Sequence, residues 1–113
     1  MQVVKICELQ GKPGPYEGIT HYVMANHDNG FDKFEIIYSE TKKGNVGSMH
    51  SHPHSEHMQY VLEGELTIIT PDKEEYEVPA GSAILIRPGE QHEVYNTYDG
   101  TTKYLVVYAD PRD

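Results

Sequence analysis

The feature of this chain that most constrains its fold is a regular succession of short apolar or alternating runs, separated by turn residues at intervals of about ten residues. Turn signals include Asp28-Asn29-Gly30, Pro71-Asp72-Lys73 and Pro79-Ala80-Gly81. No stretch carries an apolar stripe of 3.6-residue period over about twelve positions. The pattern therefore predicts an all-β sandwich or barrel with very little helix.

Ten strands are expected from these runs, and the nine tyrosines of the chain agree with a composition that favours strands. The expected strands are Val3–Leu9, Thr20–Ala25, Lys33–Glu40, Val46–Met49, His57–Glu63, Glu65–Thr70, Glu75–Val78, Ala83–Arg87, His92–Asn96 and Lys103–Tyr108. At 113 residues the chain is expected to form one domain, residues 1–113, around one hydrophobic core.

Charge, cysteine content and the lengths of the apolar runs indicate which partners and which compartment to expect. With 18 Asp and Glu against 9 Lys and Arg, the net charge is −9, which argues against a nucleic-acid partner because phosphate binding needs a basic patch. The one cysteine, Cys7, is interpreted as a structural thiol in the first strand. Because there is no signal-like N-terminus and no run of about 18 apolar residues, we expect a cytoplasmic protein without a membrane partner.

Histidines are concentrated in one segment, where four of the seven fall between His50 and His57. Side chains two positions apart on a strand share a face. Three sets share a face on this basis: His50 with His52, His57 with Gln59 and Val61, and His92 with Val94. If these faces line the interior of one barrel, the histidines converge there, whereas we expect His21 and His27 to lie on the surface.

Two spaced motifs contain these histidines. The first motif has the pattern G-x5-H-x-H-x(3,4)-E-x6-G. It is matched by Gly44, His50, His52 and Gly64, and His57 stands at the position of the glutamate. The second motif has the pattern G-x5-P-x-G-x2-H-x3-N. It is matched by Gly81, Gly89, His92 and Asn96, and the proline stands one residue late, at Pro88. In both motifs and in their order the chain resembles the cupins, and specifically the small cupins of a single domain.

The resemblance implies a double-stranded β-helix (jelly-roll) barrel with a metal ion inside. By position, the ligands it implies are His50, His52, His57 and His92, so the site contains four imidazoles. Imidazole nitrogen suits one divalent transition-metal ion, which is Fe, Mn, Ni, Cu, Co or Zn. The resemblance also implies a homodimer, for which Val3–Leu9 is the expected pairing strand because an exposed edge favours pairing.

Alternatives remain open around the expected site. Glu56 replaces His57 as a ligand if the loop before it bulges. Gln59 acts as a fifth ligand, contacts the substrate, or only lines the barrel. His54 is exposed or lies just behind the ligands, and the histidine-rich tract as a whole has a simpler interpretation as a surface metal scavenger.

Exchanging glutamate for histidine changes the chemistry that the resemblance implies. Four neutral imidazoles leave a divalent centre at +2 rather than about +1, which strengthens its action as a Lewis acid on oxygen ligands and raises its redox potential. Three hypotheses follow: a dioxygenase-like oxidoreductase acting on a small oxygenated organic molecule, a non-redox cyclase, isomerase or lyase, and a module that binds a small ligand without turnover. The pair His57 and Gln59 is similar to the polyketide-cyclase type of small cupin.

Overall fold

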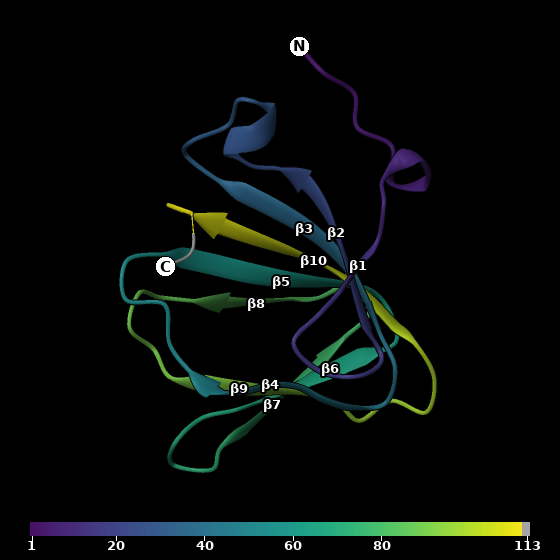
Figure 1. Ribbon diagram of the computed structural model, residues 1–113. Helices are drawn as coiled ribbons and strands as arrows, with labels where there is room; N and C mark the ends of the chain where they lie inside the picture. The colour runs from purple at the N-terminus through teal and green to yellow at the C-terminus, as the bar shows by residue number, and fades with distance from the viewer. Residues whose placement is uncertain (112–113) are drawn as a thin grey trace.

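The computed structural model describes residues 1–111, which form two antiparallel sheets that face each other (Figure 1). One sheet has six strands in the order β1-β2-β3-β10-β5-β8, and the other has four in the order β4-β9-β6-β7. The strands are β1 (Lys12–Pro13), β2 (Ile19–Ala25), β3 (Glu35–Thr41), β4 (Gly44–His50), β5 (Glu56–Glu63), β6 (Glu65–Ile69), β7 (Glu75–Pro79), β8 (Ala83–Ile86), β9 (His92–Asn96) and β10 (Thr102–Ala109). The predicted all-β jelly-roll class is confirmed.

The first expected strand is wrong. Instead of a strand over Val3–Leu9, Ile6–Glu8 forms a single 3-10 turn, and the short edge strand β1 follows it. Val3 is 87% exposed and Cys7 is exposed too, whereas Val4, Ile6 and Leu9 are half-buried. β-propensity alone does not make a strand without a pairing partner, and here the segment that pairs with β2, at Thr20 and His21, is Lys12–Pro13. The segment predicted to pair in a homodimer is thus not a strand within this chain, and the homodimer itself stays a prediction.

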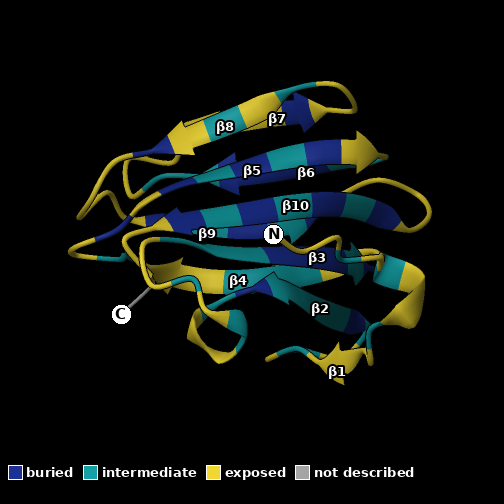
Figure 2. Ribbon diagram, turned by 90° about the horizontal axis from the view of Figure 1, so that it is seen from above, coloured by how far each residue is buried: buried dark blue, intermediate teal, exposed yellow. Residues whose placement is uncertain are grey.

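The core lies between the sheets and follows the alternation of the strands. Buried and less buried residues alternate along β5, β9 and β10, as Figure 2 shows in colour. The buried apolar cluster consists of Ile37, Val61, Leu66, Ile68, Val78, Val94, Tyr104, Val106 and Tyr108. Among the described residues, no helix is long and apolar enough to cross a membrane.

The asparagine that ends the second motif is a structural residue. Asn96 is 1% exposed. Its amide nitrogen donates to the carbonyl oxygens of Thr41 (3.0 Å) and Gly100 (3.1 Å), and its amide oxygen accepts from the backbone N–H of Tyr98 (2.9 Å) and from Thr102 Oγ1 (3.0 Å). Asn96 thus joins the end of β9 to β3 and to the turn that leads into β10, far from the histidines in the motif.

Candidate metal centre

Four histidines from four places in the chain meet at one end of the barrel. His50 ends β4 and lies opposite His92, the first residue of β9. His57 is the second residue of β5, and His52 lies in the loop between β4 and β5. The ring centroids are 4.4 Å apart for His50 and His92, 4.9 Å for His50 and His52, 5.0 Å for His52 and His57, and 5.1 Å for His57 and His92. The two motifs therefore come together as one cluster.

Backbone contacts fix the loops that carry these rings. The N–H of Gly89 donates to the carbonyl oxygen of His52 at 3.0 Å, which ties the loop of the first motif to the turn before His92. Gly89 has φ +82, a left-handed conformation that a residue with a side chain rarely adopts. The glycine of the second motif is therefore needed to place His52 and His92 against each other.

Two of the imidazoles have their orientation set by a backbone carbonyl. His92 Nδ1 is hydrogen-bonded to the carbonyl oxygen of Glu90 at 3.0 Å, and His50 Nδ1 to that of Ser48. A carbonyl only accepts, so each Nδ1 carries the proton and each Nε2 has a lone pair. This contact to the second ring nitrogen is the usual support of a metal-binding histidine.

The donor set fits a divalent transition metal. One ligand atom each from His50, His52 and His92 lies within 4.8 Å of the others, and this group contains no carboxylate. Two nitrogens that bind one ion at about 2.1 Å lie no more than about 4.2 Å apart, so small side-chain movements would bring the three into range. These residues are therefore suited to hold one ion.

His57 lies beside this group and is buried without hydrogen bonds to the described chain. Neither of its ring nitrogens, nor His92 Nε2, makes a hydrogen bond within residues 1–111. His57 is 5% exposed and His92 2% exposed. Leaving buried polar nitrogens unpaired is costly, so these atoms indicate a binding role. Tyr108 packs on the other side, with its ring centroid 5.2 Å from that of His52 and 5.0 Å from that of His57.

Burial keeps these histidines neutral. Loss of solvent contact, followed by the neighbouring imidazoles of His92 and His52, lowers the pKa of His57 from 6.5 to about 3. Burial likewise lowers the pKa of His92. Neutral imidazole is the form that binds a metal ion, so the environment favours the binding-competent state.

The lowered pKa predicts that the metal-free protein loses stability as the pH falls from 6.5 towards 3. In this window the unfolded chain takes up a proton at His57 and the folded chain does not, so acid favours unfolding. Denaturant titrations of metal-free protein across this range measure the effect. A His57→Gln variant should show a shallower pH dependence, by up to about one proton; identical slopes for the two proteins would contradict the assignment.

The other predicted site residues lie in different environments. Gln59 is 6% exposed, follows His57 on the same face of β5, and its amide oxygen makes no hydrogen bond within residues 1–111. Glu56 is exposed and has the opposite parity to His57, so the chain does not bulge in the way that would put this carboxylate among the histidines. His54 is exposed in the loop. The geometry thus brings Gln59, but neither Glu56 nor His54, to the buried side.

A cavity of about 330 Å³ opens onto the cluster from inside the barrel. His50, His52 and Gln59 line it together with Tyr16, His21, Tyr104 and Tyr108 and the apolar residues Ile37, Val46, Val94 and Val106. The volume is at the lower end of the range for small-molecule sites.

The expected surface position of His21 is wrong, because its side chain lines this cavity. The period-2 series Ile19, His21, Val23 was the signal that would have found it.

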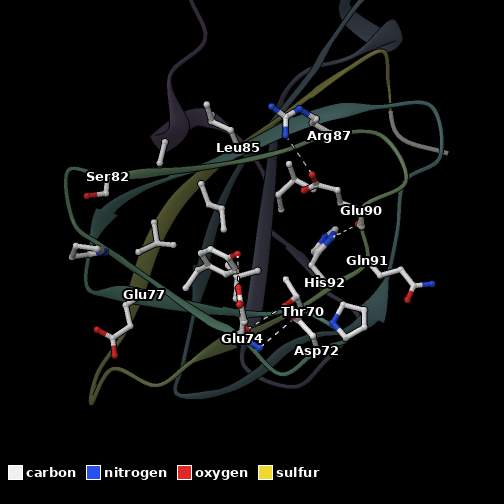
Figure 3. A pocket seen from close by; sticks show the side chains of 18 residues that line it. Thr70, Asp72, Glu74, Glu77, Ser82, Leu85, Arg87, Glu90, Gln91 and His92 are labelled. Carbon is white, nitrogen blue, oxygen red and sulfur yellow. Dashed lines mark hydrogen bonds and ion pairs between the residues drawn. The ribbon is translucent and has the colours of Figure 1, made fainter.

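A second cavity of about 770 Å³ lies along β7 and β8. Figure 3 shows His92 and its hydrogen bond to Glu90 in the wall of this cavity, with Asp72 and Glu74 at another side. His92 thus lines this second cavity, whereas His50 and His52 line the first.

The chain matches the family model described as "Cupin domain" over residues 37–108, so it belongs to the cupin family. Strands β1 and β2 precede the matched segment but extend its sheet through β3. The comparison with curated protein sequences finds no significant match.

Solved structures share the fold over nearly the whole chain. The polyketide cyclase RemF from Streptomyces resistomycificus has a TM-score of 0.84 and 29% identity, covering 99% of this chain and 81% of its own. KdgF from Halomonas sp. has a TM-score of 0.86 and 16% identity, covering 100% and 96%. Ectoine synthase from P. lautus has a TM-score of 0.81 and 17% identity, covering 98% and 79%. At their low identity the last two show the fold alone.

Proposed function

We propose that this cupin is a metal-dependent enzyme that uses one divalent ion as a Lewis acid, without a redox step, on a small oxygenated organic molecule. The observation that carries the proposal is the convergence of four histidines, in a group without a carboxylate, at the end of a cavity that His50 and His52 line. The proposed ligands are His50, His52, His57 and His92. A bound ion at +2 supplies polarisation of a carbonyl or enol oxygen of the substrate.

The chain's own residues orient the substrate in this proposal. Gln59 is buried beside His57, and its amide has one oxygen without a hydrogen bond to the described chain, so it is suited to bind a polar group of the substrate. Val94 and Val106 form apolar walls that exclude water from the reacting atoms. The ring of Tyr108 packs against the rings of His52 and His57.

The similarity to a polyketide cyclase supports the non-redox class over the oxidoreductase that the sequence placed first. RemF is 29% identical over 99% of this chain, and the sequence pair His57 and Gln59 had already suggested that type of cupin. A ring closure by intramolecular aldol condensation joins an α-carbon to a carbonyl carbon, and the two protons that the α-carbon loses leave with the carbonyl oxygen as one water. It therefore needs no oxidant, in keeping with a site of neutral nitrogen donors.

The experiment that tests the proposal is turnover of a linear 1,3,5-triketone by protein loaded with Zn²⁺, followed with and without oxygen. Zinc has no redox chemistry, so we expect ring closure at equal rates in air and under argon, with no oxygen uptake. A Gln59→Leu variant should lose about 100-fold in rate, whereas Glu56→Gln, on the outer face, should keep the wild-type rate. Turnover that needs iron and consumes oxygen would establish the dioxygenase-like reaction instead, and tight ligand binding without turnover would indicate a binding module.

A further inference from the structure

One side of the inner cavity is bounded by segments that belong to different sheets. Pro15 and Tyr16 line it from the segment between β1 and β2, which we call the strap (residues 14–18). Gly47 and Ser48 line it from β4, the edge strand of the four-stranded sheet. Figure 1 shows the strap extending from β1 towards β4. The strap therefore reaches from one sheet to the other along this side of the cavity.

Both ends of the strap are fixed by backbone hydrogen bonds. The N–H of Gly14 donates to the carbonyl oxygen of Ile19 at 2.9 Å, and the N–H of Lys42 donates to the carbonyl oxygen of Gly18 at 3.0 Å. The backbone of Gly14 also packs closely on β2, because a Cβ at this position would lie 2.5 Å from Ile19 Cγ2. The tip of the strap, which carries Tyr16, thus projects from a defined base.

The hydroxyl of Tyr16 joins the tip of the strap to β4. It bonds the hydroxyl of Ser48 and accepts from the backbone N–H of Ser48 at 3.2 Å. A phenol hydroxyl has one hydrogen and also accepts through its oxygen, so it can make both contacts at once. The ring of Tyr16 is half-buried and forms part of the cavity wall. Two contacts to one residue therefore hold this wall in place.

Ser48 lies at an irregularity of β4. Gly47 pairs with Val94 on β9. His50, three residues further along β4, pairs with His92, which is only two residues from Val94. Ser48 is therefore part of a β-bulge, where the ladder of hydrogen bonds is interrupted and the strand can redirect its groups.

The two backbone groups of Ser48 connect Tyr16 with a metal-binding histidine. The N–H of Ser48 donates to Tyr16, and its carbonyl oxygen accepts from Nδ1 of His50. These groups belong to two peptide planes that meet at the Cα of Ser48, so fixing one plane restricts the other. The ring of His50 also lies against the bare backbone of Gly47, where a Cβ would be 3.3 Å from its Cε1. The position of the strap and the orientation of His50 thus depend on the same bulge.

We propose that Tyr16 is a positioning residue that couples closure of the strap to metal binding at His50. The inference rests on the proposed metal centre and adds how that centre is regulated. With the strap docked, the carbonyl of Ser48 keeps the proton on Nδ1 of His50 and leaves Nε2 to the ion. With the strap released, this carbonyl is held less firmly and the ring also adopts its other tautomer. Coupling between two sites is reciprocal, so a bound ion in turn favours the closed cavity.

The first test is the Zn²⁺ affinity of Tyr16→Phe, measured by competition with a chromogenic chelator. This variant keeps the ring and removes both contacts to Ser48. We expect an affinity about 10-fold lower than that of the wild type, the effect of losing a contact that orients a metal ligand. Tyr76→Phe is the control, because the hydroxyl of Tyr76 donates to Glu74 in the β6–β7 hairpin, and its affinity should equal that of the wild type.

The second test measures the reciprocal effect at the base of the strap, by hydrogen exchange of the Gly14 N–H. Zn²⁺ should slow this exchange about 10-fold in the wild type, the same factor as in the affinity, and should have no effect on it in Tyr16→Phe. An unchanged affinity in Tyr16→Phe, or a Gly14 exchange rate that does not respond to Zn²⁺ in the wild type, would overturn the inference.

A measurement on metal-free protein separates this inference from the proposed function. If the wild type binds no Zn²⁺, the proposed metal function fails, and nitrogen-15 NMR of the His50 ring at pH 8 then decides the role of Tyr16. The wild type should show the tautomer with the proton on Nδ1, and Tyr16→Phe a mixture of both tautomers. The same tautomer in both proteins would contradict the positioning role.

Discussion

His92→Ala should remove stoichiometric metal binding and leave the barrel folded. His92 Nε2 is buried at the cluster without a hydrogen bond in residues 1–111, and the carbonyl of Glu90 holds the ring in place. Loss of one of four ligands should weaken affinity at least about 100-fold, more than the loss of a supporting contact does. The apolar core lies between the sheets and does not depend on the ion, so the circular dichroism spectrum should be unchanged.

His54→Ala is the matched control for His92→Ala. His54 belongs to the same histidine-rich tract but is exposed in the loop, so its removal should leave metal affinity within about 2-fold of wild type. Competitive titration with a chromogenic chelator measures both variants. Equal loss of affinity in the two would show that the tract is a surface scavenger rather than an inner site.

Asn96→Ala should lower the free energy of unfolding by about 3 kcal/mol, because it removes four hydrogen bonds at a fully buried position and leaves buried backbone groups unpaired. The affected carbonyls belong to Thr41 and Gly100, and the affected N–H to Tyr98. Urea denaturation monitored by tyrosine fluorescence measures the change.

Asn45→Ala is the control for Asn96→Ala. Asn45 on β4 has an amide oxygen that makes no hydrogen bond within residues 1–111, so truncating it should change the free energy of unfolding by no more than about 0.5 kcal/mol. A cost at Asn96 as small as the cost at Asn45 would mean that the motif asparagine serves the metal site rather than the fold.

Strand parity explains why much of the candidate site was predictable from sequence. The spacing of two along β5 puts His57, Gln59 and Val61 on the buried face, and the same rule places His92 and Val94. The two motifs then relate β4 and β5 to β9, which is distant from them in sequence. Glycines with a left-handed backbone, such as Gly89, mark the turns that bring these strands together.

The parts that were not predictable depend on pairing and on cavity shape. Val3–Leu9 has strand-like residues but pairs with no strand of either sheet, and which segments pair is not written in local composition. His21 was assigned to the surface as a lone polar residue, although it has the same parity as the inward-facing Ile19 and Val23 on β2. The reaction class depends on the metal and on the length of the cavity, neither of which a motif encodes.

The measurement that tests the central claim most directly is elemental analysis of the protein purified without a histidine tag and reloaded with Zn²⁺, expressed as ions per chain. Four converging histidines at the end of the barrel predict close to one ion per chain, retained through gel filtration. A clearly sub-stoichiometric metal content after reloading would contradict the account, since the buried nitrogens of His57 and His92 would then belong to a barrel that binds its ligands without a metal ion.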